Sequence, residues 1–254
     1  MHKHGVGTIQ MKLITFILMI ACSASAQFTK TIPFKVVSTP GIKGTPGVFN
    51  ISTNSATSGT SMSVTNTSAG EGYGLQKLHI ACADDYGLTI SNFTNNLGVA
   101  GTLYTNFNWY DSTAHAKIYY WVNSPMTWAK VQFSGTIGEA SICMLQVTNA
   151  ALASIFSGTV TNFNPNSAPT GFTNTITSDT TSLVLGYSVF ADGGRTPTFT
   201  ANKTVQSYKS VAAGTHCSTV WTYVGAATVS CGVTWDQNGT YGQGSIMLSI
   251  KGYP

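Results

Sequence analysis

Apolar and polar residues alternate in short runs along most of the chain, which is the pattern of half-buried β-strands. The pattern is clearest in residues 126–147, where 128–133 alternate in polarity and 141–147 form a mostly apolar run. Residues 134–138 between them are turn-formers, and the second run is too short for a typical helix. This stretch therefore predicts a β-hairpin.

The same pattern predicts further strands, separated by turns rich in Asn, Gly, Ser and Pro. They span residues 75–83, 88–93, 104–109, 117–122 and 183–190. The first places Leu78, Ile80 and Cys82 on one face and ends in a predicted turn at residues 84–87.

Other segments give weaker patterns. Residues 48–74 are predicted to be mostly exposed loop, with one edge strand around Met62 and Val64. Residues 150–156 are predicted to form a single helical turn, and residues 162–169 a crossing loop.

Two pairs of segments resemble each other at nearly one spacing. Residues 227–250 repeat the plan of strand, Gly-rich turn and apolar strand, with Ile246 lying 104 positions after Ile142. The strand end at Ala83 and the one at Ala191 are 108 positions apart. These similarities predict an internal duplication.

Together these elements predict an all-β fold: a two-sheet antiparallel sandwich, jelly-roll-like, with internal pseudo-duplication. Only 8% of the residues are charged and helix formers are scarce, which agrees with this class. The sandwich is expected over residues 48–254, with similar halves at about 48–150 and 170–254. Two tandem domains are the alternative, but no charged or Pro-rich linker divides the halves.

The N-terminus carries an export signal. Residues 11–26 contain a Lys, an apolar run too short to span a bilayer, and a small-x-small cleavage site before Gln27. We therefore expect a signal peptide at 1–26 and an extended lead-in at 27–47, without a transmembrane segment. The expected location is secreted, extracellular or cell-surface. An alternative interpretation uses Cys22 as a lipidated N-terminus, which would tether the protein.

Removing the leader deletes two lysines, Lys3 and Lys12, and leaves ten basic against eight acidic residues, a net charge near +2. The basic residues are scattered singly, so nucleic-acid binding is not expected.

Four cysteines remain after this removal: Cys82, Cys143, Cys217 and Cys231. An even number in an exported chain favours disulfides. Cys217 and Cys231 are equidistant from Val224, so a hairpin closed by a three-residue loop at 223–225 would place them opposite each other. Pairing Cys82 with Cys143 follows by elimination, and two buried free thiols are the alternative.

No catalytic site is predicted. The chain lacks G-x-S-x-G, H-E-x-x-H, Walker A and G-x-G-x-x-G sequences, its eight carboxylates suggest no particular pair, and its histidines are not at ligand spacing. Calcium is the one cofactor that the sequence suggests. Asp84 and Asp85 at one predicted strand end, and Asp192 at the corresponding end of the other half, have oxygens that suit it. Turn geometry alone selects the same residues.

Two clusters have the composition of a carbohydrate site, where a flat ring packs on a sugar and polar groups bind its hydroxyls. They are Asn108, Trp109, Tyr110 and Asp111, and Trp235, Asp236, Gln237 and Asn238. Both lie at predicted strand ends, where sandwich domains carry function. A binding tryptophan must be exposed, whereas core packing is the commoner fate of tryptophan in a sandwich.

The chain resembles a broad family of exported bacterial and phage-associated β-sandwich domains of mostly unassigned function. The similarity rests on strand and turn sequences at residues 94–98, 104–105, 119–121, 131–135, 146–150 and 183–186. The resemblance implies the fold and no particular activity. The cysteines depart from the family's pattern.

These observations order three functional hypotheses. A secreted or surface-exposed binding or adhesion module comes first, its partner an extracellular polysaccharide or a cell-surface glycan. A structural surface or virion-decoration protein is the alternative, and an extracellular glycan hydrolase comes third. If Trp109 and Trp235 are both buried, the structural hypothesis takes first place.

Overall fold

The computed structural model describes residues 44–65, 77–85, 88–109, 115–164, 171–191, 196–202, 207–213, 216–236 and 242–254. Every regular element in these ranges is a β-strand, so the predicted all-β class is confirmed. Over the same ranges, nothing has the length and helical apolar character of a membrane-spanning helix. The leader and most of the predicted lead-in lie outside the described residues.

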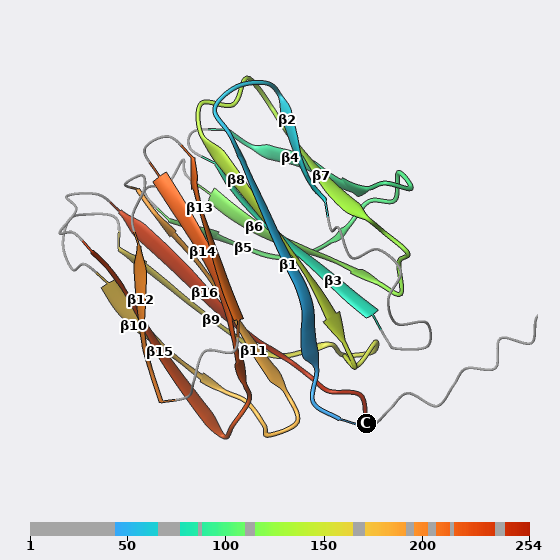
Figure 1. Ribbon diagram of the computed structural model, residues 1–254, viewed down its shortest axis with the longest axis vertical. Coiled ribbons are helices and arrows are strands. Elements are labelled where there is room, and N and C mark those ends of the chain that lie inside the picture. Colours follow the sequence, from blue (N-terminus) through green and yellow to red (C-terminus); the bar gives the residue numbers. More distant parts are fainter. Residues whose placement is uncertain are drawn as a thin grey trace, which may run out of the picture. The chain divides into compact units, whose positions relative to one another are not determined.

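The described residues contain sixteen strands, which form two sets of eight. Figure 1 shows how they are arranged. The first set is β1 Gly47–Ala56, β2 Ser61–Thr65, β3 Lys77–Asp85, β4 Ile90–Asn95, β5 Thr102–Asn108, β6 His115–Val122, β7 Trp128–Phe133 and β8 Ala140–Thr148. The second set is β9 Phe156–Asn164, β10 Gly171–Thr177, β11 Leu183–Phe190, β12 Pro197–Ala201, β13 Ser207–Ala213, β14 His216–Val224, β15 Thr228–Trp235 and β16 Gln243–Ile250.

The two sets have the same connectivity. The first forms a five-stranded sheet, β1-β8-β3-β6-β5, and a three-stranded sheet, β2-β7-β4. The second forms the sheets β13-β14-β11-β16-β9 and β10-β15-β12. Adding eight to each strand number of the first set gives the second, with every ladder antiparallel.

The predicted packing of antiparallel sheets as a sandwich is confirmed, but the described residues form four sheets rather than the two that were expected. Their side chains make three apolar cores. A central core joins the two five-stranded sheets and contains Leu78, Ile80 and Leu145 of the first set with Leu185 and Leu248 of the second. Two outer cores lie between each five-stranded sheet and the three-stranded sheet of its own set.

The central strands β3, β8, β11 and β16 of the five-stranded sheets are thus buried on both faces. In β3, for example, Leu78, Ile80 and Cys82 enter the central core, whereas Ala81 and Ala83 enter an outer core. All described side chains of β11 and β16 are buried as well. This explains why these segments are nearly continuous apolar runs rather than alternating ones.

Both predicted hairpins were wrong. β7 and β8 belong to different sheets, and so do β15 and β16. The segment between β7 and β8 crosses from one sheet to the other, held by backbone bonds from Ser134 N to Thr89 O (2.9 Å) and from Ile137 N to Gly59 O (2.6 Å). The turn residues were recognised correctly, but the strands that they join do not pair with each other.

The sequence alignment behind the predicted duplication does not match the packing. Ile142 lies in an outer core, whereas Ile246 lies in the central core. Because side chains alternate between faces along a strand, an offset that is wrong by one residue exchanges the two faces. The repeated strand order is therefore seen in the sheet topology and does not follow from that sequence alignment.

Two weakly patterned segments were also predicted incorrectly. Residues 47–56, expected as loop, form β1, an edge strand paired with β8 along its length. Its Ser, Thr and Asn residues are tolerated because an edge strand is only partly buried. The helical turn expected at 150–156 is a bent connection that leads into β9.

Gly186, in the middle of β11, makes room for a large aromatic residue. It lies opposite Trp221 of β14, and a β-carbon at this position would come within 2.2 Å of the indole. The glycine is thus required by close packing, since Trp221 fills an outer core.

The predicted Cys217–Cys231 pair was wrong. Cys217 lies in β14, opposite Phe190 and Ala212, whereas Cys231 lies in β15 of the other sheet, opposite Asn174 and Ala201. Cys231 instead has a buried thiol 2.9 Å from the hydroxyl of Tyr223. Cys82, Cys143 and Cys231 form no disulfide in the structure.

Cys82 and Cys143 are, however, directly opposite each other in the β3–β8 ladder, and both face the central core. Opposite residues of an antiparallel pair have the Cα separation that a disulfide requires. Burial, and secondarily Asp84, raise the pKa of the Cys82 thiol, which disfavours the reactive thiolate in the folded protein.

We therefore predict that a Cys82–Cys143 disulfide forms if the protein folds in an oxidising compartment, stabilising it by about 2–4 kcal/mol. Peptide mapping of the exported protein without reduction should recover the two cysteines in one linked peptide pair. Cys231 is the internal control and should be recovered alkylated after denaturation. Recovery of Cys82 as an alkylated thiol from the exported protein contradicts the prediction.

His79 is a buried histidine on the other face of β3. Its side chain is 1% exposed, and within the described part of the chain neither ring nitrogen has a hydrogen-bond partner. Burial, and then the nearby Lys77, lower its pKa from 6.5 to about 4. The imidazole is therefore neutral in the folded protein at neutral pH.

This shift predicts a loss of stability in acid. Between pH 6.5 and about 4 the unfolded chain takes up a proton that folded His79 does not, so the free energy of unfolding falls as the pH falls. The full effect, at pH values below this window, is up to about 3 kcal/mol. Urea unfolding across it should give a shallower fall for His79→Leu than for the wild type. His115→Gln is the control, and equal slopes for wild type and His79→Leu would refute the assignment.

Candidate functional site

The two tryptophans predicted to bind sugar are both core residues. Trp109, just after β5, is 1% exposed, lies in the central core and donates its indole N–H to the Asp85 carbonyl at 3.2 Å. Trp235, at the end of β15, is 4% exposed and stacks on Phe190 with ring centroids 5.2 Å apart. Neither ring can serve as a binding platform, so the predicted carbohydrate site was wrong at its two central residues.

The polar members of these clusters do not form a site either. The Asn108 side-chain oxygen lies 2.8 Å from Nδ1 of His115, across the β5–β6 ladder. Asp236 is exposed after β15. The two tryptophans belong to different cores, so the structure does not bring the clusters together. Tyr110, Asp111, Gln237 and Asn238 lie outside the described residues.

The calcium candidates are interior groups. Asp84 and Asp85 were predicted in a turn but lie in β3, and both are fully buried. A side-chain oxygen of Asp85 accepts the Leu88 N–H at 3.1 Å. Asp192 lies outside the described residues. Among the described residues, no three His, Cys, Asp or Glu side chains gather as metal ligands would.

Asp84 is part of a buried hydrogen-bond cluster that joins the two strand sets. Tyr187 of β11 and Ser141 of β8 donate their hydroxyls to the same oxygen of Asp84, and Ser218 of β14 is hydrogen-bonded to Ser141. Burial, and then Asp84, raise the pKa of Tyr187 well above its usual value. All four side chains are fully buried, so a substrate cannot reach them. Their role is therefore structural.

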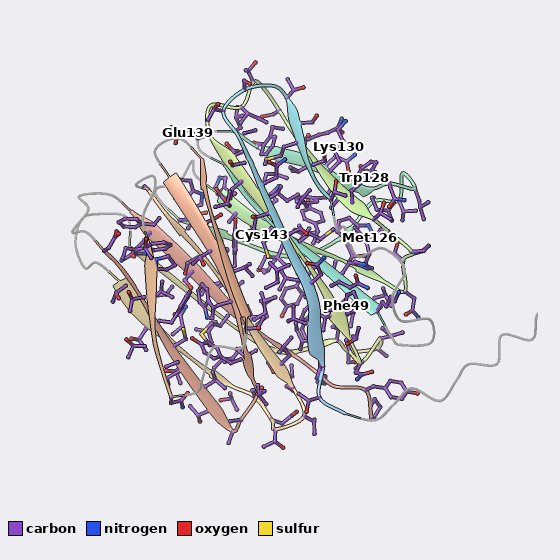
Figure 2. All side chains as sticks on the ribbon, viewed as in Figure 1. Phe49, Met126, Trp128, Lys130, Glu139 and Cys143 are labelled. Atoms are coloured by element: carbon purple, nitrogen blue, oxygen red, sulfur yellow. The ribbon has the colours of Figure 1, made fainter. Side chains whose placement is uncertain are left out.

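Trp128 has the exposure that Trp109 and Trp235 lack. It is half-buried and lies on the solvent face of β7, alternating with the buried Ala129. Figure 2 shows Trp128 and Lys130 on this strand. With part of β2 they line an open hollow of about 480 Å³, here called the Trp128 hollow, whose residues are Ser61, Met62, Ser63, Thr65, Trp128 and Lys130.

The sequence pattern contained part of this information. Alternation along residues 128–133 placed Trp128 and Lys130 on one strand face, but the sequence did not show whether that face is covered by another layer or by water. The polar residues opposite them, Ser63 and Thr65, come from β2, a strand far away in sequence. Only the pairing of β2 with β7 brings the hydroxyls beside the indole.

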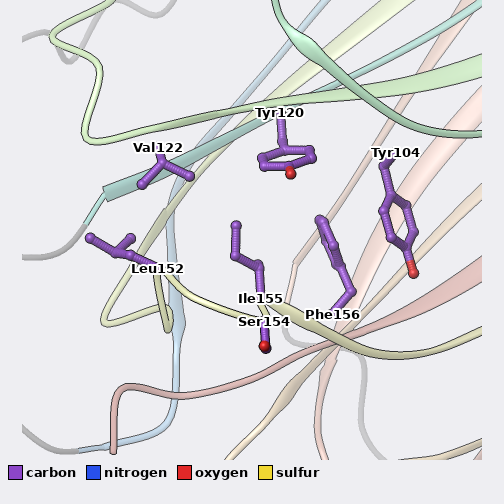
Figure 3. A pocket seen from close by; sticks show the side chains of 7 residues that line it. All are labelled: Tyr104, Tyr120, Val122, Leu152, Ser154, Ile155 and Phe156. Carbon is purple, nitrogen blue, oxygen red and sulfur yellow. The ribbon is translucent and has the colours of Figure 1, made fainter.

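A second hollow, of about 330 Å³, lies between β6 and the segment that connects the two strand sets (Figure 3). It is lined by Tyr104, Tyr120, Val122, Leu152, Ser154, Ile155 and Phe156. Phe156 packs against Tyr104 and Tyr120, with ring centroids 3.8 and 5.4 Å away. The Tyr104 hydroxyl is bonded to Thr159, so this wall is committed to internal packing.

No family model and no curated protein matches this chain.

Burial predicts how substitutions of these tryptophans will differ. Trp109→Ala and Trp235→Ala should each lower the free energy of unfolding by about 3–5 kcal/mol, because each leaves a cavity in a core. Trp128→Ala should cost clearly less, since its ring is partly in water already. Urea denaturation of the three variants tests this order. An equal loss at Trp128 would mean that this ring is a core residue too.

Proposed function

We propose that this chain is an exported structural protein of a cell surface or a virion, rather than an enzyme. The observation that carries the proposal is the burial of Trp109 and Trp235. These residues were the main support for a glycan-binding module, and in the structure they hold cores together. The export signal and the resemblance to exported bacterial and phage-associated sandwich domains support the same location.

The internal construction suits a structural role. The central core and the Asp84–Tyr187 hydrogen bond tie the two strand sets to each other, so they resist separation. Buried hydrogen-bonded groups of this kind favour one arrangement over others, because any other leaves a carboxylate without partners in the interior. A surface or particle subunit that must keep its shape benefits from this.

The outer faces are rich in hydroxyl groups. On the sheet β10-β15-β12 the solvent-facing positions include Thr173, Thr175, Thr177, Thr198, Thr200, Thr228, Ser230 and Thr234. Short, uncharged side chains of this kind let a neighbouring subunit approach closely, because they cost little entropy to order and carry no charge to desolvate.

The repeated strand order supports a finer interpretation of the fold. We interpret each set of eight strands as one jelly-roll-like unit and the pair as a duplication. The two units are joined through their larger sheets, which is why the central strands of these sheets are buried on both faces.

A binding or adhesion module is the second candidate function, and one observation favours it: the half-exposed Trp128 with its polar neighbours. The described carboxylates do not support the hydrolase hypothesis. Asp84 and Asp85 are buried, and Asp179 accepts bonds from its own turn, 2.8 Å from the Thr181 N–H and 2.9 Å from the Ser182 hydroxyl.

Fractionation of the source cells or particles tests the proposal. We expect to find the protein in the surface or particle fraction at high copy number. A short cross-linker that does not need amines should join it into a series of oligomers, either with itself or with one neighbouring protein. Soluble sugars should not release it. Recovery as a dispersed protein that turns over a polysaccharide would overturn the structural role, and release by a glycan would favour the adhesion module instead.

A further inference from the structure

We propose that the Trp128 hollow binds an acidic polysaccharide, with a uronate ring stacked on Trp128 and its carboxylate on Lys130. This inference goes beyond the structural role and does not depend on it, since a surface protein can carry a glycan site on one outer face. It rests on the geometry, charge and setting of the hollow.

The β-ladder sets the geometry. Trp128 lies opposite Thr65, and Lys130 opposite Ser63, so each of the two larger side chains has a hydroxyl neighbour on β2. Residues two apart on a strand point to the same face, about 6.6–6.8 Å from each other. The flexible Lys130 stem can therefore bring its ammonium to a substituent on a ring that lies over the indole.

The chemistry matches a sugar. The face of an indole packs well on the C–H surface of a sugar ring, and hydroxyl groups beside it bind the ring's own hydroxyls. Within the described part of the chain Trp128 makes no hydrogen bond, which leaves its indole N–H available as a donor. The backbone beside it is fixed, because the Thr127 N–H donates to the side-chain oxygen of Asn96 at 2.8 Å.

Charge selects an anionic sugar. Of the described residues that line the hollow, Lys130 is the only charged one. In the described part of the chain its ammonium has neither an ion pair nor a hydrogen bond. A cation next to an aromatic ring and hydroxyls, without a carboxylate beside it, is complementary to a sugar that carries a carboxylate.

The fold does not require this combination of residues. The strand in the equivalent position of the second set is β15, where the exposed or partly exposed residues are Thr228, Ser230 and Thr234 and the position between the last two, Gly232, is buried. The same architecture is thus built there without an aromatic or a cation. The architecture therefore does not require Trp128 or Lys130, which is typical of residues that serve binding.

Calorimetry of the purified full chain with oligogalacturonate tests the proposal. Neutral malto- and cello-oligosaccharides of the same length and a polyglutamate peptide are the comparison probes. We expect oligogalacturonate to bind, and Trp128→Ala and Lys130→Gln each to weaken it by about tenfold to a hundredfold. The affinity should fall with added salt for the wild type and much less for Lys130→Gln.

Lys251→Gln is the matched control, since it removes the same charge from a partly exposed lysine away from the hollow and should leave the affinity unchanged. Lys130→Gln keeps the packing intact, so it remains informative if Trp128→Ala unfolds. Three results overturn the proposal: no binding of oligogalacturonate, equal binding by Lys130→Gln and the wild type, or binding of neutral sugars or polyglutamate as tight as that of the uronate.

Discussion

The burial of both faces of the central strands in the two five-stranded sheets is the constraint on which the rest of the structure depends. A sandwich with two sheets leaves each outer face in water, and polar residues alternate with apolar ones along every strand. Here the larger sheets of the two strand sets pack on each other, so β3, β8, β11 and β16 need apolar or small residues at nearly every position. That requirement explains the low charge of the chain and its continuous apolar runs.

The polar cluster in the central core makes this packing specific. An apolar interface between two flat sheets tolerates sliding, because one row of aliphatic side chains packs much like the next. Asp84 and Ser141 from one set are hydrogen-bonded to Tyr187 and Ser218 from the other, and these bonds form only in a single alignment. Sliding by one strand position would leave a buried carboxylate without donors, which costs far more than the lost packing.

The same constraint limits where function can reside. Side chains of the central strands of the five-stranded sheets are committed to cores, as are the tryptophans at the ends of β5 and β15. The free faces belong to the three-stranded sheets, where alternate residues point into water. The outer face of β10-β15-β12 presents mainly Ser and Thr hydroxyl groups, whereas the outer face of β2-β7-β4 also presents Trp128 and Lys130. The difference between the two faces, rather than the shared architecture, is what can distinguish one partner from another.

The sequence by itself determined the strands. Residues 128–133 and 183–190 were predicted with the bounds that β7 and β11 have, and the other confident strands with ends shifted by a few residues. Period-two alternation and turn residues are local signals, and they suffice to locate the strands.

Tertiary structure alone decided which strands pair, because a turn after β7 or β14 is equally compatible with a hairpin and with a crossing to another sheet. The cysteine pairing and the fate of each tryptophan follow from that choice. Trp109 became a core residue and Trp128 a surface residue because a second layer covers one position and water covers the other, and the covering residues come from strands distant in sequence.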